Sequence, residues 1–278
     1  MIQDIGEHTF DNQYHPCPPD RESYALYYED HAALVRKYPD RIEFPKFRDI
    51  ERLNEDIYED AVYLFSIDGE RYYLVEEINR ERQSHFTMEN TEIFRYAEPQ
   101  YLAFAGITGY QLHNWYQSRR FCGKCGRRMK KDSKERMLYC EFCHNMEFPK
   151  ICPAVIIGVT DGDKILMSKY AGRTYKKYAL LAGFTEIGET LEETVQREVM
   201  EEVGLKVKNI RYYKSQPWSF SGTLLFGFFC DLDGDDAITL DTEELSVACW
   251  FSRDEIPDDG ENVSLTRDMM RVFKTSRP

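Results

Sequence analysis

The chain has 278 residues, 14% of them aromatic, and its 49 acidic residues outnumber its 36 basic ones to give a formal net charge of -13. This length allows about two domains with cores of their own, and the aromatic content argues against disorder. The acidic surface disfavours broad, non-specific binding of nucleic acid, which depends on neutralising phosphates. No apolar run reaches the roughly 18 residues of a membrane span, and the first residues, MIQDIGEHTF, lack the features of a signal peptide. We therefore expect a cytoplasmic protein with no membrane partner.

Residues 1–120 are expected to form an α+β domain with a structural or dimerising role. An Asp-Gly pair lies between two runs rich in aromatic and β-branched residues, 61–67 and 72–75, which predicts a β-hairpin. Apolar residues that follow Pro99 predict a helix. Nothing in the first hundred residues has a spacing typical of catalysis.

Residues 121–148 are expected to form a separate zinc ribbon. Two CxxC pairs, fourteen residues apart, supply the four cysteines Cys122, Cys125, Cys140 and Cys143. Two such pairs can complete a tetrahedral sulfur site, which leaves no position for water, so the zinc is expected to be structural. Because basic residues surround the pairs, binding of nucleic acid stays open as an alternative role. These residues are Arg119, Arg120, Lys124, Arg127, Arg128, Lys130 and Lys131.

Residues 149–278 are expected to form an α/β sandwich domain. Two buried strands, 154–159 and 164–167, are predicted to join at a turn formed by Asp161 and Gly162. Helices and strands then alternate, with a helix over about 190 to 203, strands near 207–214, 223–231 and 248–251, and a last helix after Ser264.

The segment 183–205, GFTEIGETLEETVQREVMEEVGL, predicts a helix with defined ends. Thr190 is a candidate N-cap, and Gly204 can take the left-handed conformation that ends a helix. Apolar residues recur every four positions between them and form one buried stripe, Leu191, Val195, Val199 and Val203.

Three carboxylates of this helix, those of Glu198, Glu201 and Glu202, are expected to crowd one side of it. Like charges at this spacing repel. Magnesium or manganese would relieve the repulsion, because hard divalent ions take oxygen ligands and bridge phosphate oxygens. Arg197 is placed to pair with a glutamate such as Glu189 and so fix its geometry. A solvated acidic face is the alternative, but the register of the glycines, the arginine and the glutamates favours a metal site.

These residues resemble the Nudix box at every defined position: a glycine, five residues, a glutamate, seven residues, then Arg-Glu-apolar-x-Glu-Glu-x-Gly-apolar. Residues 215–221, Ser-Gln-Pro-Trp-Ser-Phe-Ser, resemble the SQPWPFPxS signature of the NADH pyrophosphatase branch of that family. The resemblance implies the Nudix α/β/α sandwich with a mixed sheet, preceded by a four-cysteine zinc ribbon and an N-terminal domain. Two signature prolines are Ser219 and Ser221 here, which loosens the loop because proline fixes φ.

The resemblance also implies roles for single residues. Metal ligation is implied for Glu198, Glu202, Glu244 and the carbonyl group of Ala182, and Glu201 is implied to be a lesser ligand or a base. A loop after the box would line the substrate pocket, and it comprises Gln216, Pro217, Trp218, Ser219, Phe220, Ser221, Gly222 and Thr223. Phe184 would stack on a base, and Phe148 would reach the site of the partner subunit. Packing in the core is the alternative for these aromatic residues.

The activity implied by the resemblance is hydrolysis of the pyrophosphate of NADH or NAD to NMN(H) and AMP. The enzyme would be a homodimer that uses Mg²⁺ or Mn²⁺, and Glu202 or Glu244 would take the proton from water. NAD-capped RNA is a related substrate, because its 5′ end exposes the same bond. The nearest alternative is a Nudix hydrolase for ADP-ribose or another dinucleotide. A second alternative is a nucleic-acid-binding regulator with an inactive Nudix fold, which degenerate box glutamates would have favoured; here they are intact.

Overall fold

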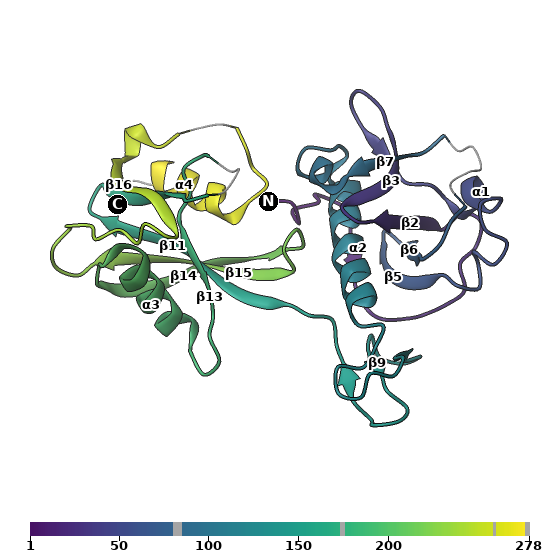
Figure 1. Ribbon diagram of the computed structural model, residues 1–278. Coiled ribbons are helices and arrows are strands. Elements are labelled where there is room, and N and C mark those ends of the chain that lie inside the picture. Colours follow the sequence, from purple (N-terminus) through teal and green to yellow (C-terminus); the bar gives the residue numbers. More distant parts are fainter. Residues whose placement is uncertain (80–84, 173–175, 258–259, 276–278) are drawn as a thin grey trace. The chain divides into compact units, whose positions relative to one another are not determined.

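The computed structural model describes residues 1–79, 85–172, 176–257 and 260–275 (Figure 1). The chain divides into two compact units. The N-terminal unit comprises Ile2–Lys150 with Ser219–Ser221, and the C-terminal unit comprises Met1, Ile151–Trp218 and Gly222–Pro278. The N-terminal unit thus includes the predicted ribbon, and the boundary expected between residues 120 and 121 stays a prediction. Among the described residues, no helix combines the length and the apolar character needed to cross a bilayer.

The N-terminal unit has the expected α+β composition. Its larger sheet has seven strands in the order β1-β5-β6-β2-β3-β4, with β7 paired to β3. The strands are β1 (Phe10–Asp11), β2 (Tyr24–Glu29), β3 (Ala32–Lys37), β4 (Ile42–Glu43), β5 (Val62–Ile67), β6 (Glu70–Val75) and β7 (Thr87–Asn90). The helices are α1 (Phe47–Ile50), the 3-10 helix η1 (Thr91–Arg95) and α2 (Gln100–Ser118). Both the hairpin, β5–β6, and the helix after Pro99, α2, are confirmed.

Two glycines allow α2 to lie close to β2 and η1. A Cβ atom on Gly109 would stand 2.5 Å from both Leu26 and the Tyr28 hydroxyl group, and one on Gly106 would stand 2.5 Å from the ring of Phe94. The Tyr28 hydroxyl donates a 2.6 Å hydrogen bond to the Gly106 carbonyl oxygen, which satisfies a buried donor. A side chain at Gly109 would push α2 away from β2, and one at Gly106 would push it away from η1.

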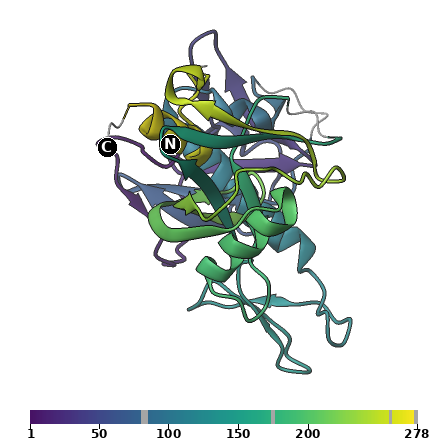
Figure 2. The same cartoon turned by 90° about the vertical axis from the view of Figure 1, so that its left-hand side faces the viewer.

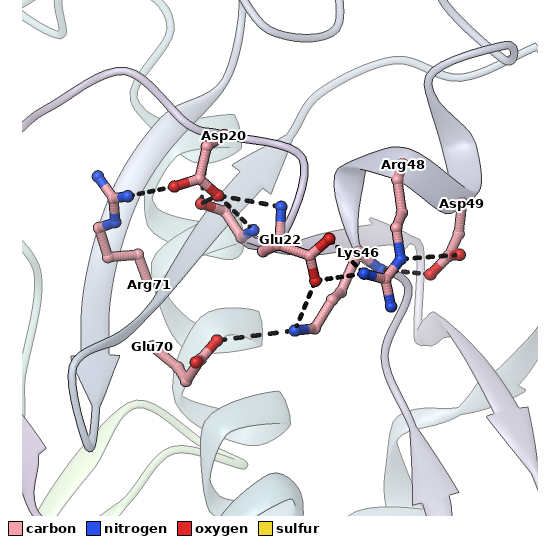
Figure 3. Close-up of polar contacts among 8 residues, drawn as sticks. Asp20, Glu22, Lys46, Arg48, Asp49, Glu70 and Arg71 are labelled. Carbon is pink, nitrogen blue, oxygen red and sulfur yellow. Dashed lines mark hydrogen bonds and ion pairs between the residues drawn. The ribbon is translucent and has the colours of Figure 1, made fainter.

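An ionic network joins the segment before β2, the start of α1 and strand β6 (Figure 3). Lys46 lies 3.4 Å from Glu22 and 3.8 Å from Glu70, and Arg48 forms an ion pair with Glu22 as well. Arg71 contacts Asp20 at 2.5 Å. Most of these side chains are exposed to solvent, so their ion pairs add little to stability. Each of these three cations is matched by a carboxylate.

The ribbon of the N-terminal unit carries a small antiparallel sheet in the order β10-β9-β8. Its strands are β8 (Lys130–Lys131), β9 (Leu138–Tyr139) and β10 (Met146–Glu147).

The C-terminal unit is built on a mixed six-stranded sheet in the order β14-β15-β11-β12-β16, with β13 paired to β11. The strands are β11 (Cys152–Asp161), β12 (Lys164–Tyr170), β13 (Leu181–Phe184), β14 (Val207–Trp218), β15 (Thr223–Leu232) and β16 (Leu245–Ser252). The helices are α3 (Leu191–Val203), the 3-10 helix η2 (Arg253–Glu255) and α4 (Leu265–Thr275). β11 and β15 run parallel and the other pairs are antiparallel.

Alternate residues of β11 face two separate cores. Val155 and Ile157 pack with the valines of α3, whereas Ile156 packs with Met269 and other residues of α4. The two helices therefore cover opposite faces of the sheet, as Figures 1 and 2 show with α3 in green and α4 in yellow. The predicted α/β/α sandwich is confirmed.

The turn between β11 and β12 lies one residue later than expected. Asp161 pairs with Lys164, so it is the last residue of β11 and not part of the turn. Gly162 and Asp163 form the turn, and Gly162 has the positive φ of 55° that glycine tolerates best.

Candidate active site and metal-binding ribbon

The acidic helix α3 begins and ends as the sequence predicts. Thr190 is the N-cap: its side chain accepts from the Glu193 backbone, and the Glu193 carboxylate accepts from the Thr190 backbone. Gly204 ends the helix with φ 70°. The valines of the predicted stripe are buried against the sheet, and Leu191 packs at its edge. This packing fixes the rotation of α3 and therefore the direction in which each glutamate points.

The three predicted carboxylates do not share one solvated face. Glu198 and Glu202, one turn apart, are only 8% and 2% exposed, whereas Glu201 lies in solvent. Each residue turns the helix by about 100°, so Glu201 is rotated away from its neighbour Glu202. Glu201 is therefore more exposed than the other two, although the same Arg197 nitrogen contacts the carboxylates of both Glu198 and Glu201, as expected for neighbours on one side of the helix.

Arg197 holds the acidic residues together. Its guanidinium group contacts both oxygens of Glu189, at 2.5 and 2.9 Å, and also Glu198 at 2.8 Å and Glu201 at 2.9 Å. It donates a further hydrogen bond of 2.9 Å to the carbonyl oxygen of Phe184. The predicted pairing with Glu189 is confirmed. Only the planar fork of arginine can serve several carboxylates in fixed directions at once.

A glycine of strand β13 leaves the space that the Glu198 side chain occupies. A Cβ atom on Gly183 would stand 1.8 Å from the carboxyl carbon of Glu198, so the carboxylate occupies the space that a side chain would fill. Its neighbour in the strand, Ala182, pairs with Ile156 of β11 in the middle of the sheet. The predicted ligand Ala182 is thus the strand neighbour of the glycine that the Glu198 carboxylate covers. Sequence reasoning missed Gly183, although it is the first glycine of the box.

The local charges determine how readily Glu198 ionises. Burial is the largest influence and raises its pKa; the Arg197 guanidinium lowers it, and the charges of Glu201 and Glu244 raise it further. The contribution of Glu244 places that exposed residue, which precedes β16, within electrostatic reach of Glu198. In contrast, the Arg197 hydrogen bond lowers the pKa of Glu189 to about 2. A cation beside Glu198 would oppose the effect of burial.

The loop after the box differs from its expected form. The residues from Gln216 to Trp218 continue strand β14, and only 219–222 form the turn to β15. Gln216 is fully buried: its amide donates to the Val263 carbonyl oxygen at 2.9 Å and accepts from the Leu265 backbone at 2.6 Å. Gln216 therefore holds the start of α4 and presents no surface to a substrate in this structure.

The other residues of the predicted loop differ in exposure. Thr223 and Ser219 are buried, Trp218, Phe220 and Gly222 are half-buried, and Pro217 and Ser221 are exposed. The aromatic residues predicted to contact substrate, Phe184 and Phe148, are both more than half exposed. Packing in the core is therefore not the role of these two phenylalanines within their units.

The ribbon consists of two matching cysteine turns. In the first, Gly126 donates to the Cys122 carbonyl oxygen at 2.8 Å; in the second, His144 donates to the Cys140 carbonyl oxygen at 2.9 Å. Gly126 and His144 have positive φ values of 74° and 57°. His144 is exposed and is not part of the group of close ligand atoms formed by the four cysteines. A backbone hydrogen bond from Cys143 lowers the pKa of Cys140 to about 6, which favours the thiolate that metals bind. A backbone hydrogen bond from Arg127 would lower the pKa of Cys125 too, but burial and the neighbouring thiols raise it to about 12.

The four sulfur atoms fit a tetrahedral metal site. All lie within 4.8 Å of one another, and two pairs stand 3.5 Å apart. Zinc–sulfur bonds of about 2.3 Å in a tetrahedron require sulfur atoms about 3.8 Å apart. Among the described residues, no other group of three or more His, Cys, Asp or Glu side chains brings its ligand atoms so close. The carboxylates around α3 are thus spread more widely than a closed ligand set.

A family model and several known proteins match part of the chain. Residues 150–272 match the family model of the NUDIX domain. The "NAD-capped RNA hydrolase NudC" of Enterobacter sp. (strain 638) is 44% identical over 149 residues, which are 54% of this chain and 57% of that protein. The protein of the same name from Pectobacterium atrosepticum is 43% identical over 149 residues, with the same two coverages. The chain therefore spans less than two thirds of the curated relatives it matches. Among solved structures, a NUDIX hydrolase from Nitrosomonas europaea is 24% identical with a TM-score of 0.48, over 56% of this chain and 90% of that one.

Proposed function

We propose that this chain, whose residues 150–272 form a Nudix domain, hydrolyses the pyrophosphate bond of NADH or NAD to NMN(H) and AMP. The same bond at the 5′ end of NAD-capped RNA is included in the proposal. The observation that carries it is the arrangement around α3, where Arg197 grips Glu189 while Glu198 lies in the space beside Gly183. The names of the relatives support the choice of substrate.

Glu198, Glu202, Glu244 and the carbonyl group of Ala182 would hold Mg²⁺ or Mn²⁺. Such ions, when bound, offset phosphate charge and lower the pKa of a bound water. Arg197 keeps Glu198 in position and also binds the exposed Glu201, through ion pairs that do not depend on the substrate. Glu202 or Glu244 would accept the proton of the attacking water as the bond between the two phosphates breaks.

The proposal extends to four further properties. They are zinc as the ion of the four cysteines, the homodimer, the cytoplasmic location, and the contribution of Phe148 to the partner subunit's site. A nucleic-acid-binding regulator with an inactive Nudix fold is disfavoured by the intact glutamates and by the arginine network that orders them.

Hydrolysis of ADP-ribose is the second candidate, because Ser219 and Ser221 replace two prolines of the signature. The experiment compares Trp218→Ala with the wild type on NADH and on ADP-ribose. Both substrates contain the diphosphate and the adenosine, so damage to the metal site would lower both rates equally. If Trp218 stacks on the nicotinamide half, its loss should cost about 1–3 kcal/mol, a roughly ten- to hundredfold fall in the NADH to ADP-ribose ratio of kcat/KM.

A matched control is Tyr212→Ala, which removes an exposed aromatic ring from the same strand but outside the loop. It should leave the ratio unchanged. A wild-type preference for ADP-ribose, or an equal loss of both activities in Trp218→Ala, would contradict the NADH assignment and leave only the general Nudix activity.

A further inference from the structure

The ribbon has the opposite charge to the rest of the chain. Residues 121–148 contain seven Lys and Arg residues and four Asp and Glu residues, whereas the whole chain has a net charge of -13. Arg119 and Arg120 extend this positive segment by two further charges. A local reversal of sign on an acidic protein concentrates any attraction for polyanions in one place.

Some of these cations are committed to neighbours within the N-terminal unit. Lys130 lies 2.7 Å from Glu141, Lys131 lies 2.6 Å from Glu76, and Arg119 lies 3.7 Å from Glu147. Arg136 is half-buried and lies over the ring of Tyr14. These four side chains therefore have structural partners, like the cations of the network in Figure 3.

Four others have no carboxylate partner. Arg120, Lys124, Arg127 and Arg128 are exposed, and none forms an ion pair with any residue in the part of the chain that the structure describes. All four fall within nine consecutive positions around the first cysteine pair. A cluster of unpaired like charges is unfavourable by itself, so an anion that joins them would be bound with a gain in free energy.

The backbone holds the two halves of this cluster side by side. Phe121 pairs with Arg128 in an isolated antiparallel bridge, and the Met129 backbone donates to the Arg120 carbonyl oxygen at 2.9 Å. The Cys122 backbone donates to the Arg127 carbonyl oxygen at 2.7 Å. The cations thus stand on one short hairpin that the cysteine turns hold in shape.

Two aromatic rings are exposed among these cations. Phe121 is 64% exposed and Phe142 is 59% exposed, and the guanidinium group of Arg127 lies 3.4 Å from the centre of the Phe142 ring. Exposed rings beside unpaired cations are the combination with which proteins bind single-stranded nucleic acid: the cations contact phosphates and the rings stack on bases. Neither free phosphate nor an acidic peptide would need the rings.

We infer that this ribbon surface, made of Arg120, Lys124, Arg127, Arg128, Phe121 and Phe142, binds single-stranded RNA. The inference rests on the proposed function, since the RNA bound there would be the strand that follows an NAD cap. The ribbon ends directly before the Nudix domain in the chain, so one polypeptide would carry both the contact to the strand and the hydrolytic site.

The test uses the full-length protein with zinc bound. One variant combines Arg120→Gln, Lys124→Gln, Arg127→Gln and Arg128→Gln; the control combines Arg21→Gln, Lys37→Gln, Arg41→Gln and Arg52→Gln, which makes the same change of charge elsewhere in the unit. Three quantities are measured: kcat/KM for NAD, kcat/KM for an NAD-capped single-stranded RNA, and the affinity for the same RNA without a cap as a function of salt. Zinc content and Tm verify that the ribbon is intact.

The ribbon variant should hydrolyse NAD within about twofold of wild type and lose at least tenfold on capped RNA. Each phosphate contact in a single strand adds about 0.7 to the slope of log K against log salt, so losing four should lower the slope by about 3. The double change Phe121→Ala and Phe142→Ala should weaken RNA binding by roughly tenfold with the slope unchanged, because stacking releases no ions. The control should behave as wild type.

Equal RNA affinity and slope in the ribbon variant and the wild type would overturn the inference. So would a ribbon variant whose subunit assembly changes in sedimentation while its RNA binding does not, because the surface would then be a protein interface. The proposed function fails separately: if the wild type hydrolyses neither NAD nor capped RNA but binds uncapped RNA through these residues, the hydrolase proposal is wrong and the RNA surface stands.

Discussion

The contact between Gly183 and Glu198 can be tested by adding one methyl group. In Gly183→Ala the new Cβ atom would stand 1.8 Å from the carboxyl carbon of Glu198 and 2.0 and 2.2 Å from its oxygens. Ordinary contacts begin near 3.4 Å, so the carboxylate must move by about 1.6 Å. Because Glu198 is buried and held by Arg197, that movement also strains the 2.8 Å ion pair between them.

We expect kcat/KM for NADH to fall by about a hundredfold or more in Gly183→Ala, since a displacement of about 1 Å at a reacting site costs roughly that much. Overpacking should also lower stability by about 1–3 kcal/mol. Turnover is measured at saturating Mg²⁺ or Mn²⁺ with chromatographic separation of NMN(H) and AMP, and the Tm is measured on the same samples.

Gly227→Ala is the matched control for overpacking of the sheet. Its Cβ atom would stand 2.8 Å from the sulfur of Met269, on the opposite side of the sheet from α3, so it should lose stability but keep activity. In a Glu198→Ala background the clash is gone, and adding Gly183→Ala should change turnover by less than about twofold. The reasoning is refuted if Gly183→Ala alone keeps near wild-type activity, or if it costs as much without Glu198 as with it.

Three further predictions concern single side chains. Glu202→Gln should lower kcat by on the order of a hundredfold or more at saturating metal with no loss of Tm, because it removes a charge and keeps the volume; unchanged turnover would refute the role of Glu202. Zinc should co-purify at about one ion per chain, and Cys140→Ser should lower Tm far more than it lowers the rate of the folded molecules; metal analysis without zinc would contradict this. Glu189→Gln should destabilise the protein at neutral pH, because the ionised Glu189 stabilises the fold through Arg197. The pKa of Glu189 is lowered to about 2, so this stabilisation is lost as pH falls from 4.5 towards 2 and the difference from wild type should vanish. Urea midpoints of the two proteins that differ by the same amount over this pH range would exclude the Arg197 bond as the cause.

Local patterns in the sequence were sufficient to predict the helices and hairpins whose geometry is set by residues close together in the chain. The period of four in α3, its threonine cap and its final glycine predict that helix to within a residue. The Asp-Gly pair predicts the β5–β6 hairpin for the same reason, because the turn residues themselves impose the geometry. The strand order of the N-terminal sheet was beyond such reasoning: β2 pairs in parallel with β6 across the forty residues 30–69, and no local pattern specifies that pairing.

The site shows the same division between local and tertiary information. A helical wheel gives the angles of Glu198 and Glu202 but not which parts of the fold cover them. The place of Glu198 against Gly183 of β13 followed only from the tertiary packing. Gln216 illustrates the opposite error. Its position in the signature implied contact with substrate, yet its amide is consumed by two backbone bonds at the start of α4. A motif identifies important residues, but it does not separate those that contact a ligand from those that stabilise the structure around the site.

The arrangement around α3 has an energetic consequence for the fold itself. Burying Glu198 and Glu202 without a full set of cations is unfavourable, and Arg197 supplies one positive charge for the three carboxylates it contacts. The stability that maintains this arrangement must come from elsewhere in the same helix. The buried valine stripe and the capping box of Thr190 provide it, at about 1.5–3 kcal/mol for each buried valine and about 1 kcal/mol for the cap. One face of α3 therefore stabilises the domain. The adjoining edge keeps a local excess of negative charge, which a divalent cation would neutralise.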